Sequence, residues 1–567
     1  RRFLPVKLLR HAENRGFGPS LDRLVREAAR LSRYPERDIA IVIEADFTHS
    51  PDSVADMVRE IEAGADVVIG ARTHHDSHVD DQPGPKRLGA RIVSTVLRAV
   101  MPLPRVSDYT STFQAFRIGT LKRALDTHQE GLRMPPVKLA DAGVVREDVV
   151  AWIMNQVRDP LVGLDVRGQI AALNTGRRRV LELIEAWGVA AVKAVMNGSI
   201  DHAREKLSER LRELPDGTWR EVQYIDHDGH ESKIYQVVCT LTKRGDRLSF
   251  DFTGTSPNAR GLINSTYSGL QAALLSAVYI NLCWDTPWNR GVRDCIDIVT
   301  EPGTVNNCTY PAPCAMATIS AVIVTIDVTW RCLSHLLVAS ERYRDQAMAV
   351  WSGTSMAPIF AGTSQHGFPF AATEMSHFGG GGGARTYADG VDTAGIVFNT
   401  TPNMPNIEDQ EAEYPVLYLF RRHLQDSGGP GRFRGGRSGE LAYTMYGAPN
   451  DHLEGLVAGT GAEMPNAIGL AGGMPGAAIR VARVVATDIR ERLAKQVLLP
   501  DTLEAVKGRR EILSCKHVRT PMAAGDVWYH SWQAGGGYGD PLTRDAATVA
   551  EDVARRVVSP AAARDIY

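Results

Sequence analysis

The stretch DTHQEGLRMPPVKLA, residues 126–140, separates two parts of the chain that differ in their pattern of residues. Before it, short apolar runs alternate with stretches of helical periodicity. After it, the chain is long and is interrupted by clusters of glycine. The stretch itself is not rich in Gly, Ser or Pro, as flexible linkers are. We therefore predict that it joins two domains directly, 1–127 and 128–567, with the junction near residues 127–130.

The composition indicates a globular protein of more than one domain. A chain of 567 residues is too long for a single hydrophobic core. The net charge of -2 disfavours nucleic-acid binding, for which a basic domain is expected. The 7 cysteines include no C-x-x-C pair, which favours reduced thiols and a cytoplasmic location. The uncharged runs 261–284 and 302–326 contain polar residues or prolines and favour core elements over membrane spans.

Residues 1–125 alternate apolar strands with amphipathic helices. The apolar run 39–43 predicts a strand, residues 51–64 a helix, and residues 65–72 a second strand. This order predicts a parallel α/β sheet. Glu44 and Asp46 follow the first strand at the end where open α/β sheets place ligands, so they could bind Mn²⁺ or Mg²⁺. The alternative is a solvated helix cap.

Several phrases in this part resemble family 2 glycosyltransferases: NRGFG, EADFTHSPDSV, GADVVIGAR and VSDYTSTFQAFR. The resemblance covers about residues 5–125 and implies a partial domain of the nucleotide-sugar transferase type. Glu44 and Asp46 stand at the D-x-D motif, which in that family holds the metal and the sugar-nucleotide diphosphate. The resemblance makes Arg72, Arg91 and Arg117 candidates for phosphate contacts; the alternative is surface solvation or structural ion pairs.

Glycine clusters mark loops in the second part of the chain, at residues 377–385, 426–436, 470–476 and 534–541. The pieces between them are short and β-rich, which predicts a large α+β region. Backbone N–H groups of glycine loops can bind phosphate, so Gly380, Gly381 and Gly382 are predicted to bind a cofactor. The alternative is a turn or close packing between backbones.

The second part also resembles a known family, the hydantoinase B/oxoprolinase family, from about residue 130 to residue 567. The phrases that carry the resemblance include EGLRMPPVKL, DVRGQIAA, DFTGTSPNARGLINST, NTTPNMPNIEDQEAEYP, DSGGPGRFRGG and GGGYGDP. It implies a partner, an A-type subunit with the actin-like ATPase fold, through which ATP is supplied. ATP would phosphorylate an amide or enolate oxygen. The family's metal-binding motifs precede the region matched here.

The candidate site consists of polar residues of these phrases and of His377, which directly precedes the glycines of the cluster 377–385. The catalytic residues are predicted to be Asp251, His377, Asn399 and Glu411, with Thr253, Asn264, Asn403 and Glu408 beside them. A structural role is the alternative for each. The main functional prediction is a subunit of an ATP-dependent cyclic imide or amide hydrolase of the hydantoinase or 5-oxoprolinase type. The alternatives are a subunit of an ATP-dependent ketone carboxylase, a glycosyltransferase using a nucleotide-sugar donor, and a non-catalytic fusion chain.

Overall fold

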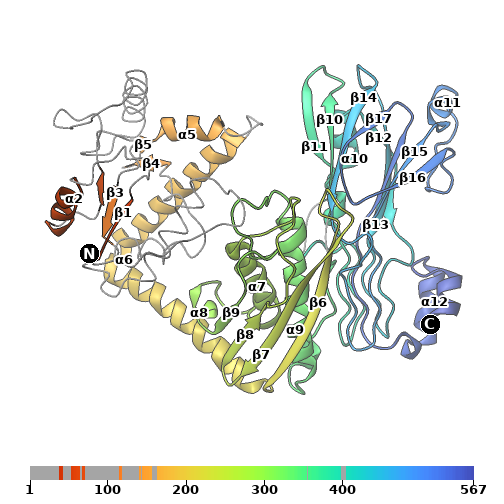
Figure 1. The fold of residues 1–567 in the computed structure, drawn as a ribbon. Coiled ribbons are helices and arrows are strands. Elements are labelled where there is room, and N and C mark those ends of the chain that lie inside the picture. Colours follow the sequence, from red (N-terminus) through yellow and green to blue (C-terminus); the bar gives the residue numbers. More distant parts are fainter. Residues whose placement is uncertain are drawn as a thin grey trace, which may run out of the picture. The chain divides into compact units, whose positions relative to one another are not determined.

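The computed structural model describes residues 38–42, 53–63, 67–69, 114–117, 139–141, 144–155, 162–353, 356–397 and 404–567 (Figure 1). The chain divides into two compact units, residues 1–138 and 139–567. Each unit is described by itself.

The first unit contains a three-stranded sheet with one described helix. Strands β1 (Ile39–Val42), β2 (Val67–Ile69) and β3 (Gln114–Arg117) lie in the order β1-β3-β2, and helix α2 spans Ser53–Glu62. The buried side chains of Met57 and Ile61 on α2 pack against apolar residues of β1. The predicted strand–helix–strand order is confirmed. The two predicted strands, β1 and β2, run in the same direction, because both are antiparallel to β3. The prediction of an all-parallel sheet is wrong for the described strands, because β3 lies between them.

The second unit begins with a short hairpin and two helices. Strands β4 (Ala140–Asp141) and β5 (Val144–Val145) pair, and helix α5 (Glu147–Met154) packs against the first turns of α6 (Val162–Glu213). Gly188 interrupts α6 with a backbone φ of 79°. Beyond this kink, Ala203, Leu207 and Leu211 recur every four residues and are buried, so one stripe of the helix packs on the domain that follows.

That domain is a mixed sheet covered by helices (Figure 1). Strands β6 (Gly217–Asp226), β7 (Ile234–Arg244) and β8 (Arg247–Asp251) are antiparallel, and β9 (Ile296–Val299) adds parallel to β8. Helices α7 (Tyr267–Leu282) and α9 (Ile323–Val338) pack on each other, and α9 lies against β6 and β7. Helix α8 (Arg290–Arg293) contacts α6, and the π-helical turn η1 (Thr318–Val322) precedes α9.

The stretch Thr318–Val338 is apolar and long enough to cross a membrane by length and composition. In the protein, 78% of its most apolar window is buried. It therefore packs as a core helix does, and the prediction that the uncharged run 302–326 is a core element is confirmed for residues 318–326.

Two antiparallel sheets form a sandwich in the C-terminal half (Figure 1). The first sheet has the order β11-β10-β14-β17, and the second has the order β12-β13-β18-β15-β16. Their facing sides share one core that includes Phe360, Tyr443, Leu453 and Trp528. The strands are β10 (Met356–Thr363), β11 (Pro369–Thr373), β12 (Val416–His423), β13 (Gly439–Met445), β14 (His452–Gly459), β15 (Arg480–Val485), β16 (Arg509–Leu513), β17 (Lys516–Ala523) and β18 (Val527–Ser531).

The outer side of the second sheet is covered as well. Helix α11 (Ile489–Ala494) places Ile489 against Ala442 and Val484 of the sheet. All residues of β13 are consequently buried. The remaining short elements are η2 (Arg344–Gln346), η3 (Ser376–Phe378), α10 (Ile407–Glu413), η4 (Pro541–Thr543), α12 (Ala546–Ala554) and α13 (Pro560–Asp565).

The glycine clusters pack against one another through their backbones. We call residues 379–384, 428–436, 469–476 and 534–539 the glycine bundle. Its N–H groups donate from Gly436 to Gly382 O at 2.8 Å, from Gly535 to Gly436 O at 3.0 Å and from Gly429 to Gly535 O at 2.9 Å. A Cβ atom added to Gly535 would overlap Gly382 O, and one added to Gly435 would overlap Gly535 O. Glycine is therefore required where these backbones approach each other.

Candidate functional site

His377 lies in a buried polar cluster of the sandwich. It is part of η3, which directly follows β11, and its side chain is fully buried. Its Nδ1 atom lies 3.1 Å from Oε2 of Glu374, whose side chain is also buried. The carboxylate fixes the orientation of the imidazole ring, as the carboxylate does in histidine–acid pairs that transfer protons.

Glu374 is the common acceptor of the cluster. It accepts hydrogen bonds from Ser376 Oγ at 2.6 Å, from Ser376 N at 3.0 Å and from the Tyr418 hydroxyl at 3.4 Å. Burial alone would raise the pKa of Glu374, but the hydrogen bonds from His377 and Ser376 outweigh burial and hold its pKa below the ordinary value. Arg421 Nη1 donates to Ser376 Oγ at 3.1 Å. Glu374 is therefore a stabilised buried carboxylate.

A second histidine, His530 on β18, is buried near His377. Burial, together with the nearby His377, lowers the pKa of His530 to about 3, so its imidazole is neutral at physiological pH. Its ring stacks on Tyr443 with a centroid distance of 5.7 Å. Among the described residues, neither ring nitrogen of His530 nor the Nε2 atom of His377 has a hydrogen-bond partner. A buried polar atom without a partner can reflect strain or a catalytic role.

The cluster can hold and accept protons, but it is not a nucleophilic triad. In such a triad the serine hydroxyl bonds to the histidine, whereas Ser376 Oγ bonds to the carboxylate of Glu374. The described part of the chain contains no group of three or more His, Cys, Asp or Glu side chains placed to hold a metal ion. The chemistry that the arrangement supports is proton acceptance at His377 Nε2, with Glu374 behind the ring.

The glycines predicted to bind a cofactor lie inside the glycine bundle. Gly381 N donates to Gln533 O at 3.4 Å, and Gly382 N donates to Val391 O at 2.8 Å. Gly380 O accepts from Gly395 N at 3.1 Å. Because Gly381 and Gly382 already donate to main-chain oxygens, the geometry favours the alternative of close backbone packing. Their role in cofactor binding stays a prediction.

The other predicted residues of this unit lie on different elements. Asp251 ends β8 and accepts from Thr253 N at 2.8 Å. Asn264 is fully buried and uses its carboxamide on main-chain groups, including Ala259 N at 2.7 Å. Glu408 and Glu411 both lie on helix α10, and Glu411 Oε1 accepts from Tyr418 N at 2.7 Å. Tyr418 thereby links Glu411 to Glu374.

Several predicted residues lie outside the described residues. They are Glu44, Asp46, Arg72, Arg91, Asn399 and Asn403. Arg117 is the last residue of β3 and pairs with Ile39 through the backbone, and its side chain is outside the described part. The metal, phosphate and catalytic roles predicted for these residues stay predictions.

A cavity of about 790 Å³ opens at the ends of β6 and β15. Asp226, Arg480 and Ser531 are among its lining residues. The Asp226 carboxylate accepts hydrogen bonds from the backbone N–H groups of residues 461–463 at 2.7–2.8 Å, which fixes the part of the cavity wall that Asp226 forms. The volume suits a small organic molecule. His377, Asp251 and Glu411 do not line the cavity.

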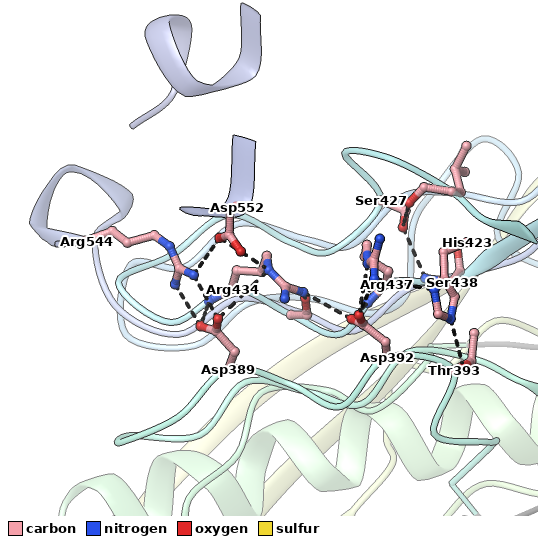
Figure 2. Close-up of polar contacts among 12 residues, drawn as sticks. Asp389, Asp392, Thr393, His423, Ser427, Arg434, Arg437, Ser438, Arg544 and Asp552 are labelled. Carbon is pink, nitrogen blue, oxygen red and sulfur yellow. Dashed lines mark hydrogen bonds and ion pairs between the residues drawn. The ribbon is translucent and has the colours of Figure 1, made fainter. Parts of the chain in front are cut away.

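Sequence reasoning missed a network of ion pairs that holds the C-terminal segment on the glycine bundle (Figure 2). The buried guanidinium of Arg544 donates to Asp389 at 2.7 and 2.8 Å and to Asp552 of α12 at 2.7 Å. Arg434 lies between Asp389, Asp552 and Asp392, at 3.2 Å from the last. The carboxylates and guanidinium groups compensate one another, so the network is structural.

The network continues to His423 on β12 (Figure 2). Arg437 donates to Asp392 at 2.7 Å and its Nη2 atom lies 3.3 Å from Nδ1 of His423. Burial and the positive charge of Arg437 lower the pKa of His423. Thr393 Oγ1 lies 3.2 Å from the other ring nitrogen. A sequence signal did exist here, because arginines are interleaved with the glycines of GRFRGGR.

The family model described as hydantoinase B/oxoprolinase matches residues 116–541, which is most of the chain. The chain belongs to the hydantoinase B/oxoprolinase family. A second model, glycosyl transferase family 2, matches residues 2–125. Both resemblances seen in the sequence are therefore confirmed at the level of family models, while the transferase fold of the first unit stays a prediction.

Two curated relatives of this hydantoinase B family member are named as enzyme subunits. The chain is 28% identical over 458 residues to the acetophenone carboxylase delta subunit of Aromatoleum aromaticum, covering 77% of this chain and 65% of the relative. It is 29% identical over 457 residues to the caprolactamase subunit beta of Pseudomonas jessenii, covering 78% and 72%. The chain thus spans about two thirds of the length of these relatives.

Two solved structures resemble the fold. Nucleotide-free acetone carboxylase superposes with a TM-score of 0.68 at 22% identity, over 81% of this chain and 60% of that chain. The ATP-dependent caprolactamase of Pseudomonas jessenii superposes with a TM-score of 0.62 at 25% identity, over 77% and 71%. The mixed α and β architecture of this hydantoinase B family member is therefore shared with both.

Proposed function

We propose that the chain is the B-type subunit of an ATP-dependent enzyme that hydrolyses a cyclic amide or imide. The family match over residues 116–541 carries the proposal. The similarity to a caprolactamase subunit supports ring opening as the reaction. In the proposal, an A-type subunit with the actin-like ATPase fold supplies ATP, phosphorylates the amide oxygen and so makes the carbonyl carbon electrophilic.

A second candidate reaction is the ATP-dependent carboxylation of a ketone. The similarity to the acetophenone carboxylase delta subunit over 458 residues favours it. The two reactions share a chemical requirement, because each begins with a carbonyl compound whose oxygen is phosphorylated. They differ in the group that attacks: water in hydrolysis, and the enolate carbon in carboxylation.

We assign His377 the role of proton acceptor within this proposal. Its Nε2 atom has no hydrogen-bond partner in the described structure, and its Nδ1 atom is fixed by Glu374. Hydrolysis requires a base for the attacking water, and carboxylation requires one for the carbon next to the carbonyl. A His377→Gln variant should lower kcat at least about 100-fold, the range for loss of a general base. It should leave the assembly of the complex unchanged.

Reconstitution tests the proposal and separates the two reactions. The full chain would be co-expressed with a candidate A-type subunit, and ATP consumption would be measured with hydantoin, 5-oxoproline or caprolactam, and with acetone or acetophenone plus labelled bicarbonate. Ring-opened product with amide-dependent phosphate release supports the hydrolase. Label in an organic acid moves the assignment to the carboxylase. A chain that neither forms a complex nor supports turnover contradicts both and favours a non-catalytic chain.

A further inference from the structure

Two cysteines lie next to each other in the loop between β9 and η1. The Sγ atoms of Cys308 and Cys314 are 3.3 Å apart, and both residues are partly exposed. The other cysteines of the chain are buried, and all are free thiols, as the sequence predicts. The loop therefore presents a thiol pair to solvent, unlike the rest of the chain.

The loop holds the two thiols in place from both sides. Cys308 N donates to Ser265 O at 2.8 Å, and Met316 N donates to Leu262 O at 2.9 Å. Between them, the buried side chain of Asn264 donates to Pro313 O at 2.9 Å. Both arms of the loop are thus anchored to residues 262–265, so little chain entropy is lost when the sulfur atoms bond.

The geometry suits a disulfide better than a metal site. A disulfide needs the sulfur atoms to approach from 3.3 Å to about 2.05 Å, a movement that side-chain rotation can supply. A zinc site would require further His, Cys or carboxylate ligands. The described residues contain no group of three or more such side chains in a metal-binding arrangement.

We propose that Cys308 and Cys314 form a reversible disulfide and make this loop a two-electron redox site. The oxidant is a small disulfide such as oxidised glutathione. One thiolate attacks it, forms a mixed disulfide and releases one glutathione thiolate. The second cysteine then attacks the protein-bound sulfur, closes the protein disulfide and releases the second glutathione. The two protons leave the protein thiols and end on the two glutathione thiols, so two thiols are oxidised and one disulfide is reduced.

The surroundings affect the rate and the consequence of this reaction. Burial of the Cys308 thiol, together with its hydrogen bond to the Cys314 thiol, raises the pKa of Cys308 to about 12. Oxidation should therefore become faster as pH rises, because the thiolate is the attacking species. Once closed, the disulfide would fix Pro313 against Asn264, next to Thr266, which caps the first turn of α7.

Mass spectrometry of the intact chain tests the proposal. The protein is incubated at mildly alkaline pH with oxidised glutathione, unfolded, alkylated and digested. Of the 7 cysteines, we expect five to be alkylated. The remaining two, Cys308 and Cys314, should appear in one disulfide-linked peptide that dithiothreitol reduces. The buried neighbours Cys239 and Cys332 are the matched control, since Cys332 Sγ lies 3.5 Å from Cys239 O and is inaccessible. They should remain thiols.

Variants separate a disulfide from single modification. Cys308→Ser should convert the reaction at Cys314 into a stable glutathione adduct, and Cys314→Ser should do the same at Cys308. Wild-type protein in which both residues remain thiols, or carry separate glutathione adducts, would overturn the proposal. This result is measured on the wild-type protein, so it does not depend on whether either variant folds.

Discussion

The glycine bundle makes a sharp prediction about stability at Gly431. A Cβ atom at this position would lie 2.6 Å from Phe433 O and 2.7 Å from both N and O of Tyr538. These atoms form the bridge between the two segments, with Phe433 N donating at 3.0 Å and Tyr538 N at 2.9 Å. The methyl group of Gly431→Ala would therefore enter a place that two main-chain hydrogen bonds already fill.

The contacts allow an estimate of the cost. Carbon and carbonyl oxygen normally stay at least about 3.3 Å apart, so the backbones must separate by roughly 0.7 Å. Such overpacking costs about 1–3 kcal/mol. Weakening two hydrogen bonds adds about 0.5–1.5 kcal/mol for each. Gly431→Ala should therefore lower the free energy of unfolding by roughly 2–6 kcal/mol.

Urea unfolding followed by tryptophan fluorescence and circular dichroism measures the effect, with Gly198→Ala as the matched control. Gly198 lies inside helix α6, and an added Cβ would meet no atom within 4 Å. Alanine there should raise stability by about 0.5–1 kcal/mol, since glycine is the poorer helix former. If Gly431→Ala unfolds within about 0.5 kcal/mol of the wild type, a typical tolerated change, the view that backbone contact excludes side chains from the bundle is refuted.

Three further predictions concern titration, ion pairing and the first unit. The folded protein keeps His530 neutral, with its pKa lowered from 6.5 to about 3, so only the unfolded chain gains a proton as pH falls below 6.5. Because of His530, the free energy of unfolding should fall by roughly 1.5 kcal/mol between pH 6.5 and 5. In urea unfolding, the free energy of His530→Phe should depend less steeply on pH than that of the wild type. Equal pH dependence of the two proteins would contradict a neutral, buried His530. Arg544→Met removes the partner at 2.7 Å from buried Asp552, leaving only Arg434 at 3.6 Å, and should cost about 3–5 kcal/mol. Arg555→Met removes an exposed pair with Glu551 and should cost under about 1 kcal/mol. If the first unit binds a nucleotide sugar, Mn²⁺ with UDP-glucose or GDP-mannose should raise its melting temperature, and no shift with either ligand would count against the transferase function.

The sequence predicted what depends on local pattern. Residues 318–326 end the uncharged run that was predicted to be core, and the stretch Thr318–Val338 that they begin is mostly buried, because its burial follows from composition. His377 was predicted because it stands directly before the glycines of the cluster 377–385, and the structure places it beside a buried carboxylate. Glu374 was missed although it stands three residues away. A glutamate in a short turn is normally solvent-exposed, and only the two sheets together bury it.

Pairings between distant segments could not be read from the sequence. Residue periodicity shows that β1 and β2 are strands, but it does not show that β3 lies between them. The neighbourhood of His377 and His530 likewise depends on the packing of two sheets. Close backbone packing was the alternative to cofactor binding for the glycine clusters, and only the hydrogen bonds reveal that the clusters pack against each other.

The glycine bundle has a consequence for the order in which the chain is completed during synthesis. Its segments come from residues 379–384 to 534–539, and the last of them bonds to each of the others. Until residue 539 has left the ribosome, the carbonyl groups of Gly436 and Phe433 lack their donors, the N–H groups of Gly535 and Tyr538. Contacts between such distant segments form slowly and late. The mixed sheet with α7 and α9 can assemble while synthesis continues, whereas closing the bundle is the step that completes the C-terminal half.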